Sequence, residues 1–296
     1  MRRKLDGVLL LDKPVGPSSS AVLQAVKRLL NAEKAGHAGT LDPLASGLLP
    51  LLFGEATKFS QFGLDADKEY VADVQLGAAT DTGDAEGAIV DRRPVSVDDD
   101  SLAQALARFR GAIEQVPPMY SALKHEGQPL YALARAGETV EREARAVTIY
   151  ELELVSRSED VLRLRIRCSK GTYVRQLAID LGLALGTVAH LAALRRTAVG
   201  ALQLDQAVAL DDLQALGEEG QKAWLLPADR MIEHLPRIDL EDPLAGRFLN
   251  GQAVRPEAVL GQPQGPCRVY QAGVLLGVGE AGAAGQLQPA RLIARG

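Results

Sequence analysis

The stretch GHAGTLDPLASG, residues 36–47, builds a tight and rigid turn around a single carboxylate, Asp42. Gly36 and Gly39 permit a positive φ and a close approach of two backbones, and Gly47 offers a second point of close approach. The proline after Asp42 fixes its own φ and biases Asp42 toward extended geometry. A carboxylate on such a loop is a candidate functional residue, although an aspartate before proline more commonly serves as a turn or helix cap.

Seven further short strings accompany this loop in one order, between about Leu5 and Val199. They are GVLLLDKP (7–14), GEATK (54–58), KEY (68–70), TDTGD (80–84), MYSALK (119–124), CSKGTYVR (168–175) and LRR (194–196). Together with the Asp42 loop they resemble the bacterial TruB-type tRNA pseudouridine synthases, which isomerise the T-loop uridine of tRNA, position 55. One short motif carries little weight, whereas a colinear set over nearly two hundred residues is specific.

The composition favours a folded protein with a large domain and room for a small one. The chain has 296 residues, of which 47% are apolar and 4% aromatic, so aliphatic side chains must supply most of the core. A formal net charge of −5 argues against a generally basic nucleic-acid coat. Residues 108–200 nevertheless carry 14 basic and 10 acidic side chains. That excess is compatible with a local phosphate-binding face and equally with ordinary scatter.

Cysteine and histidine usage argues against a disulfide framework and against a metal centre. The two cysteines, Cys168 and Cys267, are far apart and lack CxxC spacing, which is typical of a reducing compartment. The four histidines show no metal-ligand spacing. No apolar run approaches the length of a membrane span or of a signal-peptide core, so we expect a cytoplasmic protein with no membrane partner.

Hydrophobic periodicity places several strands and helices in the first 200 residues. It predicts strands at 7–12, 68–76 and 161–168 and helices that follow the serines at 18–20, span 101–109 and span 172–185. The strand at 161–168 alternates strictly and sets Arg163, Arg165 and Arg167 on one face. This arginine row could touch phosphates or could be a solvated face, and the sequence leaves both open.

Composition also divides the chain. Residues 117–146 combine prolines, glycines and mixed charges, which is typical of a protruding insertion. After about residue 236, prolines and glycines punctuate short apolar runs, which predicts a small β domain. We therefore expect a mixed α/β (α+β) domain at 1–236 with a long, largely antiparallel sheet, and a small β domain at 237–296. The resemblance implies a pseudouridine synthase catalytic domain, an RNA-clamping role for the insertion, and a PUA-like C-terminal module.

The resemblance makes Asp42 the catalytic carboxylate. Pseudouridine formation breaks the glycosidic bond of uridine, turns the base and rejoins it through carbon. A carboxylate suits this reaction as a nucleophile or as a stabiliser of an oxocarbenium-like sugar, and the sequence does not distinguish the two. The resemblance also implies a catalytic arginine at Arg175, whose charge would favour the ionised carboxylate and whose fork could orient it. Taken alone, Arg175 would be a helix-surface charge.

A target base inside a folded loop must be extruded before it can react. By resemblance, Tyr70 stacks on the extruded base and can transfer a proton, while Tyr173 and Leu194 line the same pocket. By resemblance, His37 fills the place that the base leaves in the RNA. Taken alone, Tyr70 would be a core tyrosine of an alternating strand, and His37 would be a histidine bonded to a loop carbonyl.

Basic residues complete the predicted site. Lys13 and Pro14 match a string that, by resemblance, supports the active-site loop, and Lys13 is also a candidate for substrate binding. The candidates for phosphate contacts are Lys124, Arg142, Arg145, Arg195 and Arg196.

The resemblance as a whole implies a monomeric enzyme that acts on the T stem-loop of tRNA without metal or cofactor. Two other functions compete with it: an RNA-binding protein that helps tRNA to fold, with chemistry secondary, and a carboxylate glycosidase. The glycosidase is disfavoured because such enzymes normally need a paired carboxylate, and no second one shares this loop.

Overall fold

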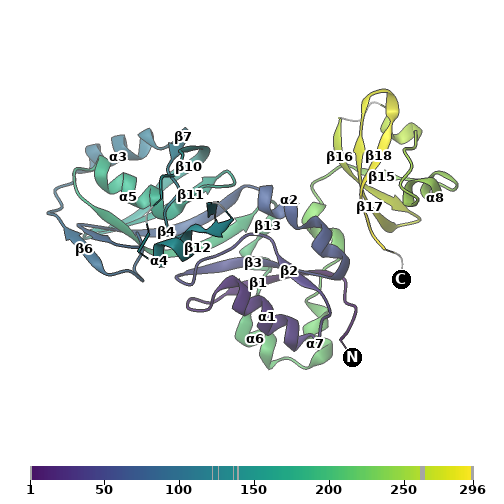
Figure 1. The fold of residues 1–296 in the computed structure, drawn as a ribbon, viewed down its shortest axis with the longest axis horizontal. Coiled ribbons are helices and arrows are strands. Elements are labelled where there is room, and N and C mark those ends of the chain that lie inside the picture. The colour runs from purple at the N-terminus through teal and green to yellow at the C-terminus, as the bar shows by residue number, and fades with distance from the viewer. Residues whose placement is uncertain are drawn as a thin grey trace.

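The computed structural model describes residues 2–121, 123–125, 127–135, 137–138, 140–260 and 264–294. One long sheet runs through the first 210 residues, in the order β14-β1-β3-β12-β4-β11-β10-β7, with β2 paired to β3 and β13 to β12 (Figure 1). Its strands are β1 (Gly7–Lys13), β2 (Ala35–His37), β3 (Ala45–Phe53), β4 (Lys68–Leu76), β7 (Gly111–Gln115), β10 (Arg145–Ser158), β11 (Val161–Cys168), β12 (Ala189–Val199), β13 (Leu202–Gln203) and β14 (Val208–Ala209). The β1–β14 and β3–β12 pairs are parallel and the other pairs of this sheet are antiparallel, which confirms the expected α+β fold with a largely antiparallel sheet.

Helices, short sheets and 3-10 turns complete the fold, and of these α8, η4 and η5 belong to the C-terminal residues described below (Figure 1). The helices are α1 (Ser19–Leu29), α2 (Ser60–Asp65), α3 (Asp99–Arg108), α4 (Leu130–Arg135), α5 (Val174–Ala184), α6 (Leu210–Ala215), α7 (Glu218–Ala223) and α8 (Leu244–Leu249). The 3-10 turns are η1 (Gly54–Phe59), η2 (Leu204–Gln206), η3 (Ala228–Ile232), η4 (Glu257–Val259) and η5 (Ala283–Gly285). Two hairpins pair β5 (Ala78–Thr80) with β6 (Ile89–Arg92) and β8 (Lys124–His125) with β9 (Gln128–Pro129).

The predicted elements form with small shifts at their ends. The Ser18 hydroxyl accepts a hydrogen bond from the Ala21 amide at 3.2 Å and caps α1, as the run of serines indicates. Helix α3 begins before the predicted residue 101 because the Asp98 carboxylate caps it. Helix α5 begins at Val174, since Tyr173 has extended geometry and occupies the N-cap position.

Two apolar clusters meet at the centre of the sheet. One joins α5 and α3 to strands β4, β10 and β11, and the other joins α1 to β1 and β3. Tyr70 on β4 and Leu194 on β12 pack against both clusters. The catalytic candidates on these strands therefore lie where the two halves of the core adjoin. A third cluster packs η1 and η3 against alternate residues of β1 and β3, which point to the opposite face of the sheet.

Glycine is required in the Asp42 loop at the two positions where the backbone turns to positive φ. Gly47 has φ +100°, and a Cβ there would lie 2.3 Å from the Arg196 carbonyl oxygen on β12. Gly39 also has φ +100°. Gly36 lies within β2 and adopts no positive φ, so the expectation was wrong for this residue. The close approach at Gly47 is what lets β3 pair with β12 directly after the loop.

The arginine row of β11 forms a solvated, ion-paired face. Its guanidinium groups alternate outward from buried neighbours, as predicted. Each binds a carboxylate on an adjacent strand, in the pairs Arg163–Asp73 at 2.7 Å, Arg165–Glu153 at 2.6 Å and Arg167–Glu151 at 2.8 Å. Because these charges already have partners, the structure favours the solvated face over a phosphate-binding row.

The C-terminal residues form a separate four-stranded sheet in the order β15-β16-β17-β18, drawn in yellow-green to yellow in Figure 1. Its strands are β15 (Arg237–Asp239), β16 (Gly265–Gln271), β17 (Val274–Ala281) and β18 (Leu287–Leu292). The GEATK string holds the end of this sheet. The Lys58 ammonium donates to the Leu292 carbonyl at 2.8 Å, and the Glu55 carboxylate accepts from the Ala294 amide at 2.6 Å.

We expect Lys58→Met to loosen this end of the C-terminal sheet without harming the core. The variant removes the donor to Leu292 and the cation that lies 2.5 Å from Glu55. Loss of one charge-assisted hydrogen bond at a partly exposed position corresponds to about 1–1.5 kcal/mol, or about a tenfold faster hydrogen exchange at the Ala294 amide. Amides of β4 should keep their protection, and Lys4→Met serves as the control. Unchanged exchange at Ala294 would contradict the assignment.

Candidate active site

The structure brings Asp42 and Arg175 together. Arg175 lies in the first turn of α5, and its Nη2 is 2.8 Å from Asp42 Oδ2. The arginine side chain is 8% exposed, whereas that of Asp42 is 45% exposed. A buried cation therefore orients a carboxylate that stays accessible to solvent, which is the arrangement a reacting carboxylate needs.

A second carboxylate, Asp84, lies behind Arg175, and sequence reasoning did not single it out. Its Oδ2 is 3.5 Å from Arg175 Nε, and its side chain is only 5% exposed. The Thr82 hydroxyl donates to Asp84 Oδ1 at 2.6 Å. Arg175 also donates to the main-chain oxygens of Thr82 at 3.3 Å and Tyr120 at 2.6 Å. The signal was present in the TDTGD string, where the carboxylate of Asp84 follows three polar residues and a glycine.

Two buried side chains hold the Asp42 loop in place. The Ser19 hydroxyl donates to the Leu41 carbonyl at 2.8 Å and accepts from the Leu41 amide at 2.8 Å, so one side chain fixes both main-chain groups of the residue before Asp42. The sequence indicated Ser19 only as one of three capping serines. The Pro43 carbonyl accepts from the Gly16 amide at 2.8 Å, which ties the other side of the turn.

Arg196 is the second anchor, and its predicted phosphate contact is wrong. Its side chain is 1% exposed, and it donates inward to the main-chain oxygens of Leu48 at 2.8 Å, Gly39 at 3.2 Å and Thr40 at 3.4 Å. Burial lowers the pKa of this guanidinium. A side chain that reaches two carbonyls of the loop and the Leu48 carbonyl of β3 from inside cannot also face an RNA backbone.

Of the three predicted pocket residues, Tyr70 and Tyr173 lie near enough to Asp42 to feel its charge, and Leu194 packs against the same core clusters as Tyr70. Tyr70 lies opposite Arg196 in the register of β4 and β12, and it packs against both core clusters, as does Leu194. Burial raises the pKa of the Tyr70 and Tyr173 phenols, and the charge of Asp42 raises both further. Both hydroxyls are therefore protonated near neutral pH and lie within electrostatic reach of Asp42. Tyr70 is half-buried where the two core clusters adjoin. Its place in the core is therefore compatible with the predicted role in the base pocket.

His37 and Lys13 differ in how deeply they are buried next to the loop. His37 ends β2 and is half-buried, and burial together with the Arg196 charge lowers its imidazole pKa. Within the described residues its buried Nδ1 has no hydrogen-bond partner, so a loop carbonyl does not hold it through that atom. Lys13 is fully buried, donates to the Pro14 carbonyl at 2.8 Å, and has a pKa lowered to about 8 by burial. Its direct substrate contact is wrong, because no part of the side chain is accessible, and it supports the loop from within.

The other basic candidates have different surroundings. Arg195 is exposed and binds Asp12 with two nitrogens, at 3.1 and 2.6 Å. Arg142 donates to the Pro117 carbonyl at 3.0 Å and so joins the two ends of the insertion. Arg145 begins β10 and is exposed. The Lys124 side chain lies outside the part of the chain that the structure describes.

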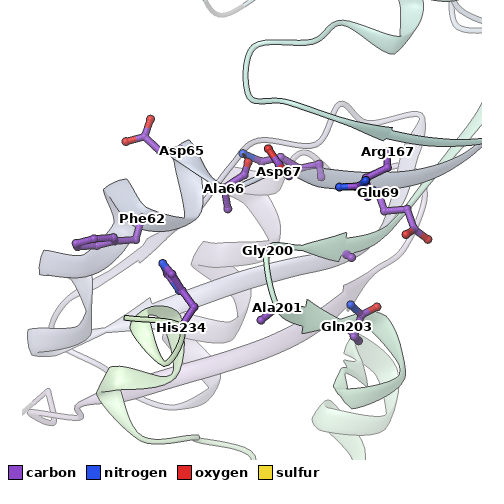
Figure 2. A pocket seen from close by; sticks show the side chains of 12 residues that line it. Phe62, Asp65, Ala66, Asp67, Glu69, Arg167, Gly200, Ala201, Gln203 and His234 are labelled. Carbon is purple, nitrogen blue, oxygen red and sulfur yellow. Dashed lines mark hydrogen bonds between the residues drawn. The ribbon is translucent and has the colours of Figure 1, made fainter. Parts of the chain in front are cut away.

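A separate cleft of about 500 Å³ opens near the start of β4 (Figure 2). Figure 2 shows Phe62 and His234 toward one end of it and Glu69 and Arg167 toward the other. Asp42, Tyr70 and Arg175 are not among its lining residues. The carboxylate of Asp42 therefore does not line this cleft.

The described residues hold no group of three His, Cys, Asp or Glu side chains that could bind a metal ion. In the same part of the chain, no helix is long and apolar enough to cross a membrane. Cys168 and Cys267 are both buried and unpaired.

We expect Ser19→Ala to slow turnover by misplacing Asp42. The substitution leaves the buried amide and carbonyl of Leu41 without partners, which should cost about 1–3 kcal/mol of stability. A small displacement of the carboxylate should lower the single-turnover rate about tenfold or more. Ser18→Ala is the matched control, because it removes a helix cap worth about 1 kcal/mol without touching the loop. Equal rates for the two serine variants would show that Ser19 does not position the loop.

Comparison with known proteins gives one consistent result. Residues 27–174 match the model of the TruB family pseudouridylate synthase N-terminal domain, residues 175–233 that of the tRNA pseudouridylate synthase B C-terminal domain, and residues 236–293 that of the pseudouridine synthase II TruB C-terminal domain. The tRNA pseudouridine synthase B of Aromatoleum aromaticum is 57% identical over 295 residues, which cover 99% of this chain and 94% of the relative. That of Burkholderia mallei is 57% identical over 303 residues, covering 100% and 99%. Among solved structures, a chain of an H/ACA RNP bound to a substrate RNA containing 2'-deoxyuridine superposes with a TM-score of 0.74 at 27% identity, covering 98% of this chain and 85% of that one.

Proposed function

Because the chain belongs to the TruB family of pseudouridylate synthases, we propose that its Asp42 site isomerises the T-loop uridine at position 55 of tRNA to pseudouridine. The relatives at 57% identity over nearly their full length are tRNA pseudouridine synthases, so this chain is an isomerase of the same class. The observation that carries the site assignment is the accessible Asp42 carboxylate paired at 2.8 Å with the buried Arg175.

The proposed chemistry uses Asp42 at the sugar. The bond between C1' and N1 of uridine breaks, the base turns within the pocket, and a bond between C1' and C5 forms. N1 then carries a proton and C5 loses one, so the reaction is an isomerisation with no net gain or loss of atoms. Asp42 acts as the nucleophile at C1' or as the counter-charge of an oxocarbenium-like sugar. Arg175, itself fixed by Asp84, keeps the carboxylate oriented throughout.

Tyr70, Tyr173 and Leu194 form the proposed pocket for the extruded base. Stacking of the base on the Tyr70 ring would contribute about 1–3 kcal/mol. The neutral Tyr70 phenol, whose pKa is raised by burial, can donate its proton and take one back only through a transient phenolate, whose negative charge nearby Arg196 would stabilise. His37, uncharged near neutral pH, is proposed to replace the base in the RNA stack.

The RNA partner is proposed to be the T stem-loop. Lys124, Arg142, Arg145 and Arg195 remain candidates for phosphate contacts, with the insertion at 117–146 clamping the stem. Arg195 would have to share its guanidinium with Asp12. We propose a division into residues 1–236 and a PUA-like unit at 237–296, a monomeric enzyme, and a cytoplasmic location, which the two buried free cysteines support.

Tritium release tests this function. The chain is incubated with tRNA whose uridines carry tritium at C5, and with the same tRNA in which the T-loop uridine is replaced by cytidine. Release from the first and not the second supports both the reaction and the target. A folded protein that binds tRNA but releases no tritium would refute the proposal and leave a tRNA-folding protein, the competing function.

A further inference from the structure

Gln115 makes an unusual pair of contacts at the edge of the active site. It is the last residue of β7 and is 2% exposed. Its side-chain oxygen accepts from the Tyr173 amide at 3.0 Å, and its side-chain nitrogen donates to the Tyr173 carbonyl at 3.3 Å. One amide side chain therefore contacts both main-chain groups of one residue, as a neighbouring strand would.

The local sequence explains why a side chain serves in place of a strand. Residues 117 and 118 are both prolines, which carry no amide hydrogen and cannot extend the ladder of β7. The backbone therefore leaves the sheet at Gln115. The Tyr173 carbonyl already accepts from the Leu177 amide at 3.0 Å in α5, whereas the Tyr173 amide still needs an acceptor. The glutamine side chain reaches across, supplies the missing acceptor for the amide and adds a second donor to the carbonyl.

Tyr173 is the residue at which fixing the backbone matters for the site. It is the N-cap of α5, with φ −103° and ψ 107°, and no side chain caps that helix. Its ring lies in the proposed base pocket, and Arg175 follows two residues later in the first helical turn. The direction in which α5 starts therefore sets both the ring and the guanidinium that holds Asp42.

The same segment contacts Arg175 a second time. The Tyr120 carbonyl, five residues beyond Gln115, accepts from Arg175 Nη2 at 2.6 Å, the nitrogen that also binds Asp42. Residues 115 and 120 thus hold residues 173 and 175 through two independent hydrogen-bonding groups. Of these, only the Gln115 contact is made by a side chain and can be changed by substitution.

We propose that Gln115 is a positioning residue for the isomerisation: by fixing the backbone of Tyr173 it sets the orientation of Arg175 against Asp42 and of the Tyr173 ring against the base. The proposal rests on the site proposed above. Gln115 itself touches neither the sugar nor the base, so it acts on the rate of the chemical step and not on the capture of RNA.

The test compares Gln115→Met with Gln221→Met in the full chain. Methionine has a similar volume and makes neither hydrogen bond. Gln221 is 6% exposed and donates to the Leu216 carbonyl at 2.7 Å, far along the chain in α7, so its variant loses a comparable buried contact. For each we would measure the single-turnover rate of tritium release at saturating enzyme, the Kd for tRNA, and the hydrogen exchange of the Tyr173 amide.

We expect Gln115→Met to lower the single-turnover rate about tenfold to a hundredfold with Kd within about threefold, because small misplacements of reacting groups are costly. The Tyr173 amide should exchange at least about tenfold faster, since its acceptor is gone. Gln221→Met should keep both the rate and this exchange. Gln115→Asn retains an amide on a shorter stem that cannot span both groups, and it serves if the methionine variant does not fold.

A folded Gln115→Met or Gln115→Asn protein with the wild-type rate would overturn the proposal, as would unchanged exchange at Tyr173. The exchange readout needs no substrate. A wild-type protein that releases no tritium would therefore refute the proposed function, while the exchange ratio would still decide whether Gln115 holds Tyr173.

Discussion

Asp42→Asn is expected to abolish turnover while tRNA binding is kept. Asparagine has nearly the shape of aspartate but is neither a nucleophile nor a counter-charge, so the single-turnover rate of tritium release should fall by about 10³-fold or more. The Kd for tRNA should stay within about threefold, because Asp42 is one small group of a large RNA interface. The fold should hold, since Arg175 keeps Asp84 and two main-chain oxygens as partners.

Asp73→Asn is the matched control for this experiment. Asp73 is also a carboxylate of the main sheet paired to an arginine, Arg163 at 2.7 Å, but it lies on the solvated face. Its variant should turn over at the wild-type rate. Normal turnover by Asp42→Asn would remove Asp42 from the mechanism.

Arg175→Met is expected to damage both the fold and the chemistry. It leaves Asp84 as a buried carboxylate without its cation, and breaking a buried pair in this way typically costs about 3–5 kcal/mol. It also frees Asp42 to rotate, so the single-turnover rate should fall by at least about 10²-fold. Urea unfolding followed by circular dichroism measures the first effect, and tritium release the second.

The double variant Arg175→Met, Asp84→Asn separates these two effects. Removing the orphaned charge should restore most of the lost stability, because an amide is far less costly to bury than a carboxylate. Turnover should stay low, since nothing then orients Asp42. A double variant that recovers both stability and turnover would show that Arg175 matters only for the fold.

The parts of the fold that depend on local pattern could be predicted from the sequence. Strict alternation fixed the bounds and facing of β11, and the serine run located the start of α1. Alternation along β12 also explains why Arg195 is exposed and Arg196 is buried, because neighbouring residues of a strand point to opposite faces. The predicted phosphate contact of Arg196 is wrong because it was based on residue type, since arginine is rarely buried, and not on the position of Arg196 in the strand.

The rest of the site depends on contacts between distant segments. Ser19 bonds to Leu41, Asp84 lies behind Arg175, and Gln115 reaches Tyr173, each across a separation that no local pattern encodes. The carboxylates that pair with the β11 arginines come from β4 and β10. These ion pairs therefore could not be predicted from the local sequence either. The TDTGD string belongs to the set of motifs that carries the resemblance. Only the fold shows that Asp84 is the residue of this string whose carboxylate lies next to Arg175.

The anchoring of residues 36–47 has a consequence for the order of events. Ser19 and Arg196 hold the turn through hydrogen bonds made within the protein itself. The carboxylate therefore loses little conformational entropy when the substrate arrives, because that entropy was given up when the protein folded. The free energy of RNA association is left for unstacking the uridine, so the substrate, and not the catalytic loop, is the flexible partner that must adapt.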